Sequence, residues 1–419
     1  MESGTKDDSI EKFRGFHIDD DGDDEVQEII VDEDDDEDDE DDDEDEQQPV
    51  TLGFLEEKEY DWSLLRQSFP SKAGGVPAWL DPVNLPSGRS SACDICGEPL
   101  QFVLQVYAPI SEKESAFHRT LFVFMCQSMT CLLRDQHEQW KRYPEKASRS
   151  VKVFCCQLPH LNPFYPSAPP RYDGTDKPSG TGAKLCNWCG TWKGDKVCSS
   201  CRKVHYCSQK HQVTDWRLAH RIDCQRLSLS SQSSDSCSSN GGTTSSEIQK
   251  VASNTLWPEY EIRNVDESEY DTEMMEDNGH ASSLITSNRV DDTMNSLLQK
   301  FEGDSDKKSW ASFQQRIVKA PEQVVRYCRD AGAKPLWPMS SGRPSQADIP
   351  KCRYCNGAMI FEFQILPQLL YYFNVKNDAD SLDWATIVVY TCESSCEASV
   401  AYKEEFAWVQ LYSPSASVP

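Results

Sequence analysis

Six cysteines and two histidines lie at regular intervals between Cys186 and Cys224. The pattern is C-x2-C, eight residues, C-x2-C, five residues, C-x3-H, eight residues and H-x3-C. Each short pair can bind one tetrahedral zinc ion from a tight turn, so four pairs predict two zinc ions. A segment of 39 residues is too short to bury a sizeable apolar core. The metal must therefore supply much of its folding free energy.

The same spacing, with Tyr206 before the third pair and Trp216 before the last, resembles the MYND zinc finger. The resemblance implies that the ligands of the two ions are interleaved along the chain. It assigns one zinc ion to Cys186, Cys189, Cys207 and His211. It assigns the other to Cys198, Cys201, His220 and Cys224. His211 stands where many members of that family have cysteine, and either residue can bind zinc. A disulfide-stapled module is the alternative, but the histidines favour a metal.

Two further sets of four cysteines occur in segments that repeat one another. The first set is Cys93, Cys96, Cys126 and Cys131. The second set is Cys352, Cys355, Cys392 and Cys396. A Pro-x-Trp sequence precedes each set, and a glutamine follows nine residues after each C-x2-C pair. Four thiolates leave no coordination position for water or substrate, so each set predicts a structural zinc site. Eight buried free cysteines are the alternative.

Charge is distributed unevenly along the chain. The net charge is -28, yet residues 1–48 hold 26 acidic and 3 basic side chains, and 32–46 are acidic at every position. The remaining residues are close to neutral, which argues against general DNA binding. No apolar run has the length of a membrane span, and the chain begins without an apolar signal segment. We therefore expect a cytoplasmic protein that can shuttle to the nucleus, with no DNA or membrane contact.

We expect an α+β, mainly β fold. The two repeated zinc-binding halves should form one pseudo-symmetric domain, with the small finger inserted between them. The expected parts are a disordered acidic tail at 1–48, a first repeat half at 51–170, the finger at 186–224, a mostly flexible Ser-rich linker at 228–290 with a docked segment near 257–261, and a C-terminal half at 291–412. Residues such as Ser, Gly and Asn dominate 228–246, which is typical of a flexible linker.

Several individual elements follow from periodicity. Strands are expected at 101–107 and 119–125, and helices at 132–143, 291–301 and 309–319. Val324, Val325 and Cys328 share a helical face, so a further helix is expected to start at Pro321. Cys155 and Cys156 lie in an apolar run and are expected to be buried.

Motifs spread along the chain are similar to those of the programmed cell death protein 2 family. They include FPSK-GG-PAWL at 69–80, LQVYAP at 104–109, PEYE at 258–261, PEQVVRY at 321–327 and FEFQILPQLL at 361–370. The resemblance implies a role in maturation of the small ribosomal subunit. It further implies that members of this family escort one newly made basic ribosomal protein, universal small-subunit protein five, and bind it mainly through the repeats.

The sequence also bears on two other classes of function, a peptide-binding adaptor and an enzyme. A MYND finger can bind proline-rich peptides, so an adaptor in transcriptional regulation or in control of cell death and proliferation is the alternative. MYND fingers also accompany lysine methyltransferases, but the chain has no matching catalytic segment. It also lacks G-x4-G-K-[ST], H-E-x-x-H and G-x-S-x-G sequences. We expect no enzymatic activity, no catalytic residues and zinc as the cofactor.

Overall fold

The structure is a computed structural model that describes residues 49–141, 148–176, 182–229, 255–270, 304–376, 378 and 380–412. These residues all belong to one compact unit, Gln47–Pro419. The acidic tail at 1–48, the helix expected at 291–301 and most of the Ser-rich linker lie outside the described residues. Among the described helices, none combines the length and the apolarity that crossing a bilayer requires.

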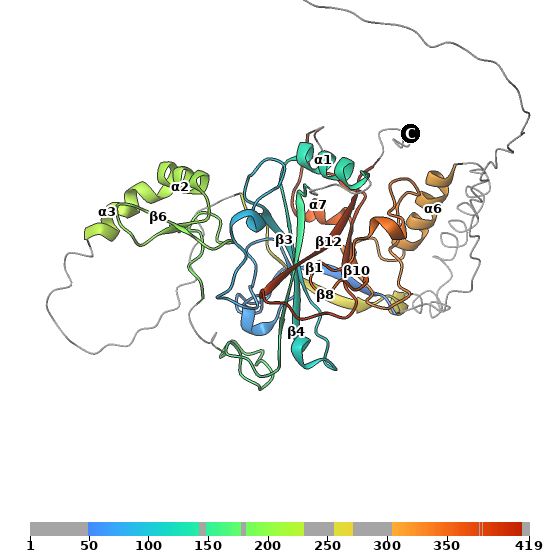
Figure 1. The fold of residues 1–419 in the computed structure, drawn as a ribbon, viewed down its shortest axis with the longest axis horizontal. Helices are drawn as coiled ribbons and strands as arrows, with labels where there is room; N and C mark the ends of the chain where they lie inside the picture. Colours follow the sequence, from blue (N-terminus) through green and yellow to red (C-terminus); the bar gives the residue numbers. More distant parts are fainter. Residues whose placement is uncertain are drawn as a thin grey trace, which may run out of the picture. The chain divides into compact units, whose positions relative to one another are not determined.

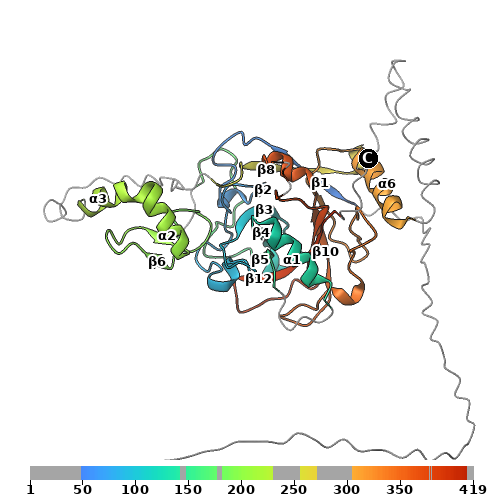
Figure 2. The same ribbon diagram turned by 90° about the horizontal axis from the view of Figure 1, so that it is seen from above.

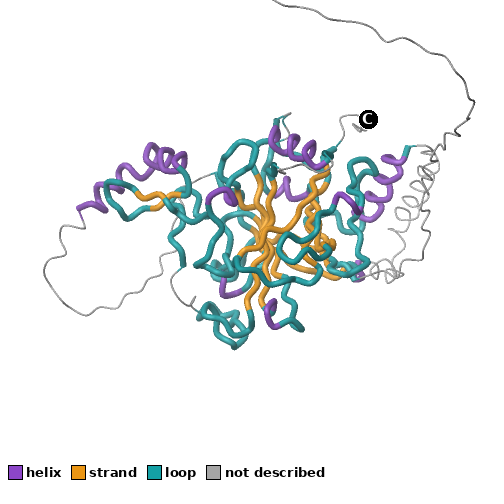
Figure 3. Tube along the Cα trace, in the orientation of Figure 1, coloured by secondary structure: helices purple, strands orange, loops and turns teal. Residues whose placement is uncertain are grey.

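Ten strands close into a barrel in this part of the chain (Figures 1 and 3). Their order around the barrel is β1, β8, β2, β3, β4, β5, β12, β11, β10 and β9, and all neighbours are antiparallel. The strands are β1 Thr51–Glu56, β2 Lys72–Ala73, β3 Gln101–Tyr107, β4 His118–Met125, β5 Val151–Leu158, β8 Tyr260–Asp266, β9 Val325–Tyr327, β10 Met359–Ile365, β11 Thr386–Cys392 and β12 Tyr402–Gln410.

Helices and a small hairpin surround the barrel or belong to the finger. Outside the finger the α-helices are α1 Met129–Gln139, α6 Ser305–Ile317 and α7 Gln368–Tyr372. Short 3-10 turns are η1 Arg66–Ser68, η2 Gly88–Ser91, η3 Glu114–Ala116 and η5 Gln346–Asp348. The finger holds β6 Lys196–Val197, β7 His205–Tyr206, α2 Gln209–Asp215, the π-helical turn η4 Trp216–His220 and α3 Arg221–Leu229. Helix α1 packs against β12 (Figure 2), where the Gln139 side-chain amide exchanges two hydrogen bonds with the Val409 backbone.

Strand β4 is buried on both faces, because its two sets of alternating side chains enter different clusters. Leu121 and Val123 join the cluster that collects apolar side chains from all around the barrel, so this cluster fills the interior. Phe122 and Phe124 point the other way and join aromatic residues of the finger. The near-continuous apolar run of this strand is the sequence signature of such a two-sided position.

Most expected elements are confirmed. The strands at 101–107 and 119–125 are β3 and β4. The helices expected at 132–143 and 309–319 are present as α1 and α6, each beginning a few residues earlier. Trp257 docks as expected and stacks on Phe373, with ring centroids 4.6 Å apart.

Two expectations are wrong. The helix expected from Pro321 through Cys328 is absent, and Val325–Tyr327 forms strand β9 between β1 and β10. Cys328 accordingly follows a strand and is buried there. The loose linker expected after residue 261 begins instead with strand β8, which pairs with β1 and β2. In both places the hydrogen bonds offered by neighbouring strands outweigh the local pattern, as is usual for short strands.

The repeated segments occupy matching places in the strand order. Consecutive antiparallel strands β3, β4 and β5 come from the first half, and β10, β11 and β12 from the second. Both β3 and β10 contain a register shift, at Phe102–Leu104 and at Phe361–Phe363. Strand β5 pairs with β12 and β1 pairs with β9, so both halves contribute to a single barrel.

Candidate metal centres

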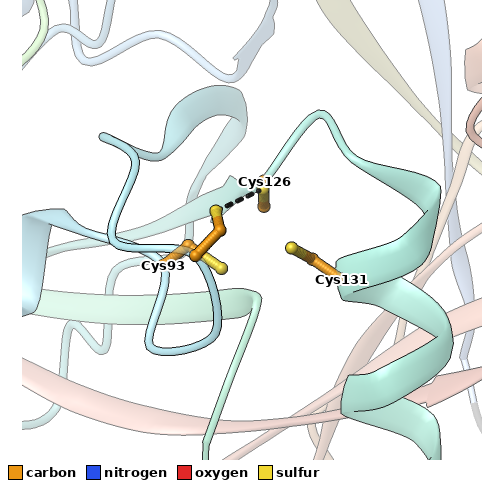
Figure 4. Close-up of side chains that lie close together, drawn as sticks. Cys93, Cys126 and Cys131 are labelled. Carbon is orange, nitrogen blue, oxygen red and sulfur yellow. Dashed lines mark hydrogen bonds between the residues drawn. The ribbon is translucent and has the colours of Figure 1, made fainter. Parts of the chain in front are cut away.

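The four cysteines of the first half meet at one end of β3 and β4. Cys93 and Cys96 lie in the turn before β3, and Cys126 follows the last residue of β4. Cys131 lies in the first turn of α1 and points toward Cys126 (Figure 4). All four sulfur atoms lie within 4.8 Å of one another, and those of Cys96 and Cys126 are 3.6 Å apart.

The second half gathers its four cysteines in the same way. Cys352 and Cys355 occupy a turn before β10, Cys392 ends β11, and Cys396 lies in the following loop. Their sulfur atoms also lie within 4.8 Å of one another. The Cys352–Cys396 and Cys355–Cys392 sulfur distances are 3.7 and 3.6 Å.

The finger brings its ligands together as two interleaved sets. The first set comprises Cys186, Cys189, Cys207 and His211, and the second comprises Cys198, Cys201, His220 and Cys224. His211 faces its set with Nδ1, which is 3.2 Å from the Cys207 sulfur. His220 faces its set with Nε2, which is 3.5 Å from the Cys201 sulfur. The Ser208 hydroxyl accepts a hydrogen bond from the His211 backbone N–H, which caps α2 and fixes that ligand.

These distances fit zinc. In a tetrahedron with zinc–sulfur bonds of about 2.3 Å, two sulfur atoms lie roughly 3.8 Å apart. Five sulfur–sulfur separations, drawn from all four sets, run from 3.6 to 3.9 Å, and all ligand atoms of each set lie within 4.8 Å of one another. Because all four positions of each set are protein ligands, these are closed sites that hold structure together and leave no position for a substrate.

A recurring backbone turn presents each C-x2-C pair. The residue after the second cysteine has a positive φ in all four cases, namely Gly97, Gly190, Arg202 and Asn356. The backbone N–H of that residue donates to the carbonyl of the first cysteine, over 2.7 to 3.0 Å. The turn therefore folds both thiols onto one side. The glycine or asparagine at three of the four positions was a sequence signal for this turn that the spacing analysis did not use.

The pKa values of the thiols in the two half-barrel sets are shifted in opposite directions, and the thiolate is the form that binds metal. A hydrogen bond from the Cys126 thiol lowers the pKa of Cys93 to about 5. Burial alone would raise the pKa of Cys392, but hydrogen bonds from the Ser394 hydroxyl and the Cys396 backbone N–H lower it to about 6. Burial raises the pKa of Cys131 to about 11 and also raises that of Cys396, so Cys93 and Cys392 are the readier thiolates of their sets.

The finger is anchored to the barrel by two reciprocal tryptophans. The indole N–H of Trp192 donates to the Leu100 carbonyl over 2.7 Å, and the ring packs on Phe124 with centroids 4.4 Å apart. The indole N–H of Trp79 donates in the opposite direction, to the Thr191 carbonyl over 2.8 Å. Both side chains are buried. The finger thus shares an aromatic core with β4, which the sequence analysis did not foresee.

The remaining described cysteines take no part in a ligand set. Cys155 and Cys156 lie on β5 and are buried, as expected. Cys328 is also buried, and burial raises the pKa of its thiol. Cys237 lies outside the described residues.

An open groove of about 1130 Å³ runs along the seam where β5 meets β12. Both halves line it: Val83 and Leu158 come from the first, and Glu397 and Val400 from the second. The pairing of β5 with β12 ends at Cys156 and Tyr402. Beyond this point, β4 is the only described strand that pairs with β5.

The fold and the four ligand sets define a zinc-binding β-barrel protein with an inserted finger. Family profiles match the chain in three parts: the programmed cell death protein 2 N-terminal domain over 49–172, the MYND finger over 186–224 and the C-terminal domain of the same family over 307–411. The chain belongs to the programmed cell death protein 2 family.

Curated relatives agree with this assignment. Programmed cell death protein 2 of Bos taurus is 36% identical over 372 residues, which cover 86% of this chain and 96% of that protein. Programmed cell death protein 2-like of Homo sapiens is 27% identical over 346 residues, or 78% and 85% of the two chains. Probable 20S rRNA accumulation protein 4 of Schizosaccharomyces pombe is 28% identical over 120 residues, or 25% and 28%. No solved structure matches the chain.

Proposed function

We propose that this protein is a zinc-stabilised escort of universal small-subunit protein five, a basic ribosomal protein, during small-subunit biogenesis. The observation that carries the proposal is the similarity to a yeast relative whose name refers to accumulation of 20S rRNA. That name concerns a ribosomal RNA in the relative. The proposal transfers the process to this chain and adds the client that the family resemblance implies.

The charge of the chain suits such a client. Ribosomal proteins are rich in basic side chains that bind RNA phosphates, and this chain has a net charge of -28. A polyanion can attract a basic protein and keep RNA from binding it prematurely. Because the metal centres are closed, we propose that zinc stabilises the fold and that the protein has no enzymatic activity.

We place the client on the groove between β5 and β12. Val83 and Val400 are exposed on its walls, at 44% and 47%. The partly unpaired edge of β5 can donate and accept backbone hydrogen bonds with an extended segment of the client. The groove walls combine apolar side chains with charged ones such as Lys113, Glu114 and Lys403. The apolar contacts and the backbone hydrogen bonds to β5 are the part of the binding that salt would screen little.

The test is capture and solubility of the recombinant ribosomal protein. The full chain should keep it soluble after co-expression, whereas a second basic protein from the large subunit should not be captured. Val83→Lys with Val400→Lys should weaken capture at least about tenfold, since each removes an apolar contact and places a positive charge against the basic client. Val318→Lys is the matched control, because Val318 is 56% exposed and lies outside the groove. Equal capture of both basic proteins would overturn the proposed specificity.

A peptide-binding adaptor remains the second candidate, favoured by the MYND finger itself. On that hypothesis proline-rich peptides bind the finger, and the barrel serves as a platform. The two candidates separate cleanly in the capture experiment. The groove variants should leave binding of a proline-rich peptide unchanged, and an adaptor would show no preference for the ribosomal protein.

The proposal extends to architecture and location. The matching register shifts support two halves related by duplication, with boundaries near 51–170 and 291–412. A second match also supports it: Gln105 accepts a hydrogen bond from the Ala78 N–H, and Gln364 accepts one from the Leu336 N–H, each inside a Pro-x-Trp sequence. An escort that meets its client during synthesis would be cytoplasmic and would shuttle to the nucleus. Imaging of a tagged chain before and after a block of nuclear export tests this.

A further inference from the structure

The finger differs in charge from the rest of the chain. Residues 182–229 hold nine lysines and arginines but only three acidic side chains. Each Cys3His set with a bound zinc ion adds one negative charge, so the loaded finger keeps a net charge of about +4. The near-neutral sum over residues 49–419 conceals this basic module within an acidic protein.

Part of that charge is concentrated on one face of the helical segment formed by η4 and α3. Arg217 and Arg221 lie four residues apart, as do Leu218 and Ile222, so the four side chains share a face. All four are exposed, and Leu218 and Ile222 are 70% and 67% exposed. We call these four residues the arginine–aliphatic face.

The metal fixes the direction of this face. His220 lies between its residues in sequence, Cys224 follows two residues after Ile222, and both belong to the second ligand set of the finger. Both are buried, so they point to the opposite side of the helix. The zinc ligands therefore hold the arginines and aliphatic side chains outward. Within the described part of the chain, the two arginines form no ion pair and the two aliphatic side chains belong to no core cluster.

We propose that the arginine–aliphatic face binds an acidic polypeptide segment that carries aliphatic or aromatic side chains. Guanidinium groups form paired hydrogen bonds with carboxylates. The leucine and isoleucine would bury apolar side chains of the same segment, in the manner of an amphipathic helix laid against another. The charge complementarity and the i, i+4 pairing of both residue types select this partner chemistry.

Other partners fit less well. The proposed ribosomal client is basic and would be repelled, so this surface serves a separate partner and does not rest on the proposed function. Nucleic acid would use the arginines through its phosphates but would leave two adjacent aliphatic side chains in water. A module with a net charge of about +4 also offers few phosphate contacts.

The test measures binding of a fluorescein-labelled peptide to the full chain by anisotropy. The peptide is built from glutamate and leucine, with leucines at helical spacing, and is about 18 residues long. Charge reversal by Arg217→Glu with Arg221→Glu should weaken its binding at least about tenfold. Lys184→Glu with Lys196→Glu is the matched control, because both lysines are exposed on the finger but lie outside the face. That pair should weaken binding less than about threefold, as expected for screened long-range attraction.

A second pair of variants tests the apolar half of the proposal. Leu218→Ser with Ile222→Ser should weaken the glutamate–leucine peptide while leaving a polyglutamate peptide of equal charge unaffected. Unchanged zinc content in all variants shows that the finger stays folded. Equal losses of peptide affinity in the two charge-reversal pairs would overturn the proposal, because the peptide would then be attracted by the charge of the whole finger and not by this face. Tighter binding of a single-stranded RNA of equal charge, lost with Arg217 and Arg221, would overturn it in favour of nucleic acid.

Discussion

Arg119 on β4 and Glu362 on β10 form a bidentate ion pair, with Nη1–Oε1 and Nη2–Oε2 distances of 2.6 and 2.7 Å. Both side chains are buried, and they come from different halves of the chain. Burial alone would raise the pKa of Glu362, but the charge of Arg119 holds it below its usual value. The Tyr327 hydroxyl and the Arg329 guanidinium also donate to this carboxylate. The pair therefore ties the halves together through the barrel.

Removing one partner of this pair should destabilise the protein severely. Glu362→Ala leaves the Arg119 charge buried without its carboxylate, which costs about 3–5 kcal/mol. Denaturant unfolding measures the loss. The double variant Arg119→Met with Glu362→Leu should recover at least half of it, because the only charge then left without this carboxylate is that of Arg329, which is partly exposed. Equal losses in the single and double variants would show that shape, not charge pairing, sets the stability there.

The turn after the first C-x2-C pair predicts a selective effect of backbone conformation. Gly97 has a φ of 76°, and a Cβ built there meets nothing within 4 Å. Gly97→Val should therefore cost about 1–2 kcal/mol through its left-handed backbone alone. Gly97→Asn should be tolerated, since Asn356 occupies the matching position of the second half. Unfolding curves compare the two variants, and equal stability would contradict the proposed role of the turn.

The sequence predicted the metal ligands more completely than it predicted the strand topology. Ligand spacing identified the short pairs, because a chelate requires particular residue types at close, fixed intervals. The resemblance to the MYND finger supplied the interleaved assignment of its two sets, and the internal repeat supplied the other two sets that the structure gathers. Strand β9 could not be identified in this way. Val324, Val325 and Cys328 fit a helical face, and a strand of three residues is too short to show alternation. Its conformation is decided by β1 and β10, which are distant in sequence. The contact between Arg119 and Glu362 depends on barrel closure and has no local signature either.

The anchoring of the finger can be tested through Trp192. Trp192→Ala should remove the indole hydrogen bond to Leu100 and the packing on Phe124, at a cost of about 3–5 kcal/mol. The ligands are untouched, so zinc content should stay constant while limited proteolysis near residue 182 becomes faster. Trp216→Ala is the control, because Trp216 lies on the finger but is 41% exposed. Loss of zinc from the Trp192 variant would mean that docking and metal binding are inseparable.

A buried histidine predicts a pH-dependent part of the stability. His118 lies between the Phe69 ring and the Tyr107 hydroxyl, and burial lowers its pKa from 6.5 to about 4. The imidazole binds a proton more readily in the unfolded chain than in the folded one. The stabilising contribution of neutral His118 is therefore complete well above pH 6.5 and is lost as the pH falls toward 4. At pH 5 the loss is about 2 kcal/mol.

The measurement compares wild type with His118→Gln. The difference between their unfolding free energies at pH 7.5 and pH 5 isolates this histidine, because acid effects on the metal ligands are common to both proteins. Wild type should lose about 2 kcal/mol more than the variant. An identical pH dependence of the two proteins would contradict the assignment.

Metal content gives the most direct test of the four ligand sets. Native mass spectrometry of the intact chain should find four zinc ions, two in the finger and one in each half. Cys352→Ser removes one thiolate from the second-half set, and three remaining ligands should bind zinc too weakly to retain it through desalting. The variant should therefore hold three ions. Cys328→Ser is the matched control, because this cysteine is equally buried in the same half but belongs to no ligand set among the described residues. It should keep four.

Three ions in wild type, with no further loss in Cys352→Ser, would show that the second half folds around free thiols. The barrel strands and the Arg119–Glu362 pair would then be the features that hold this half together.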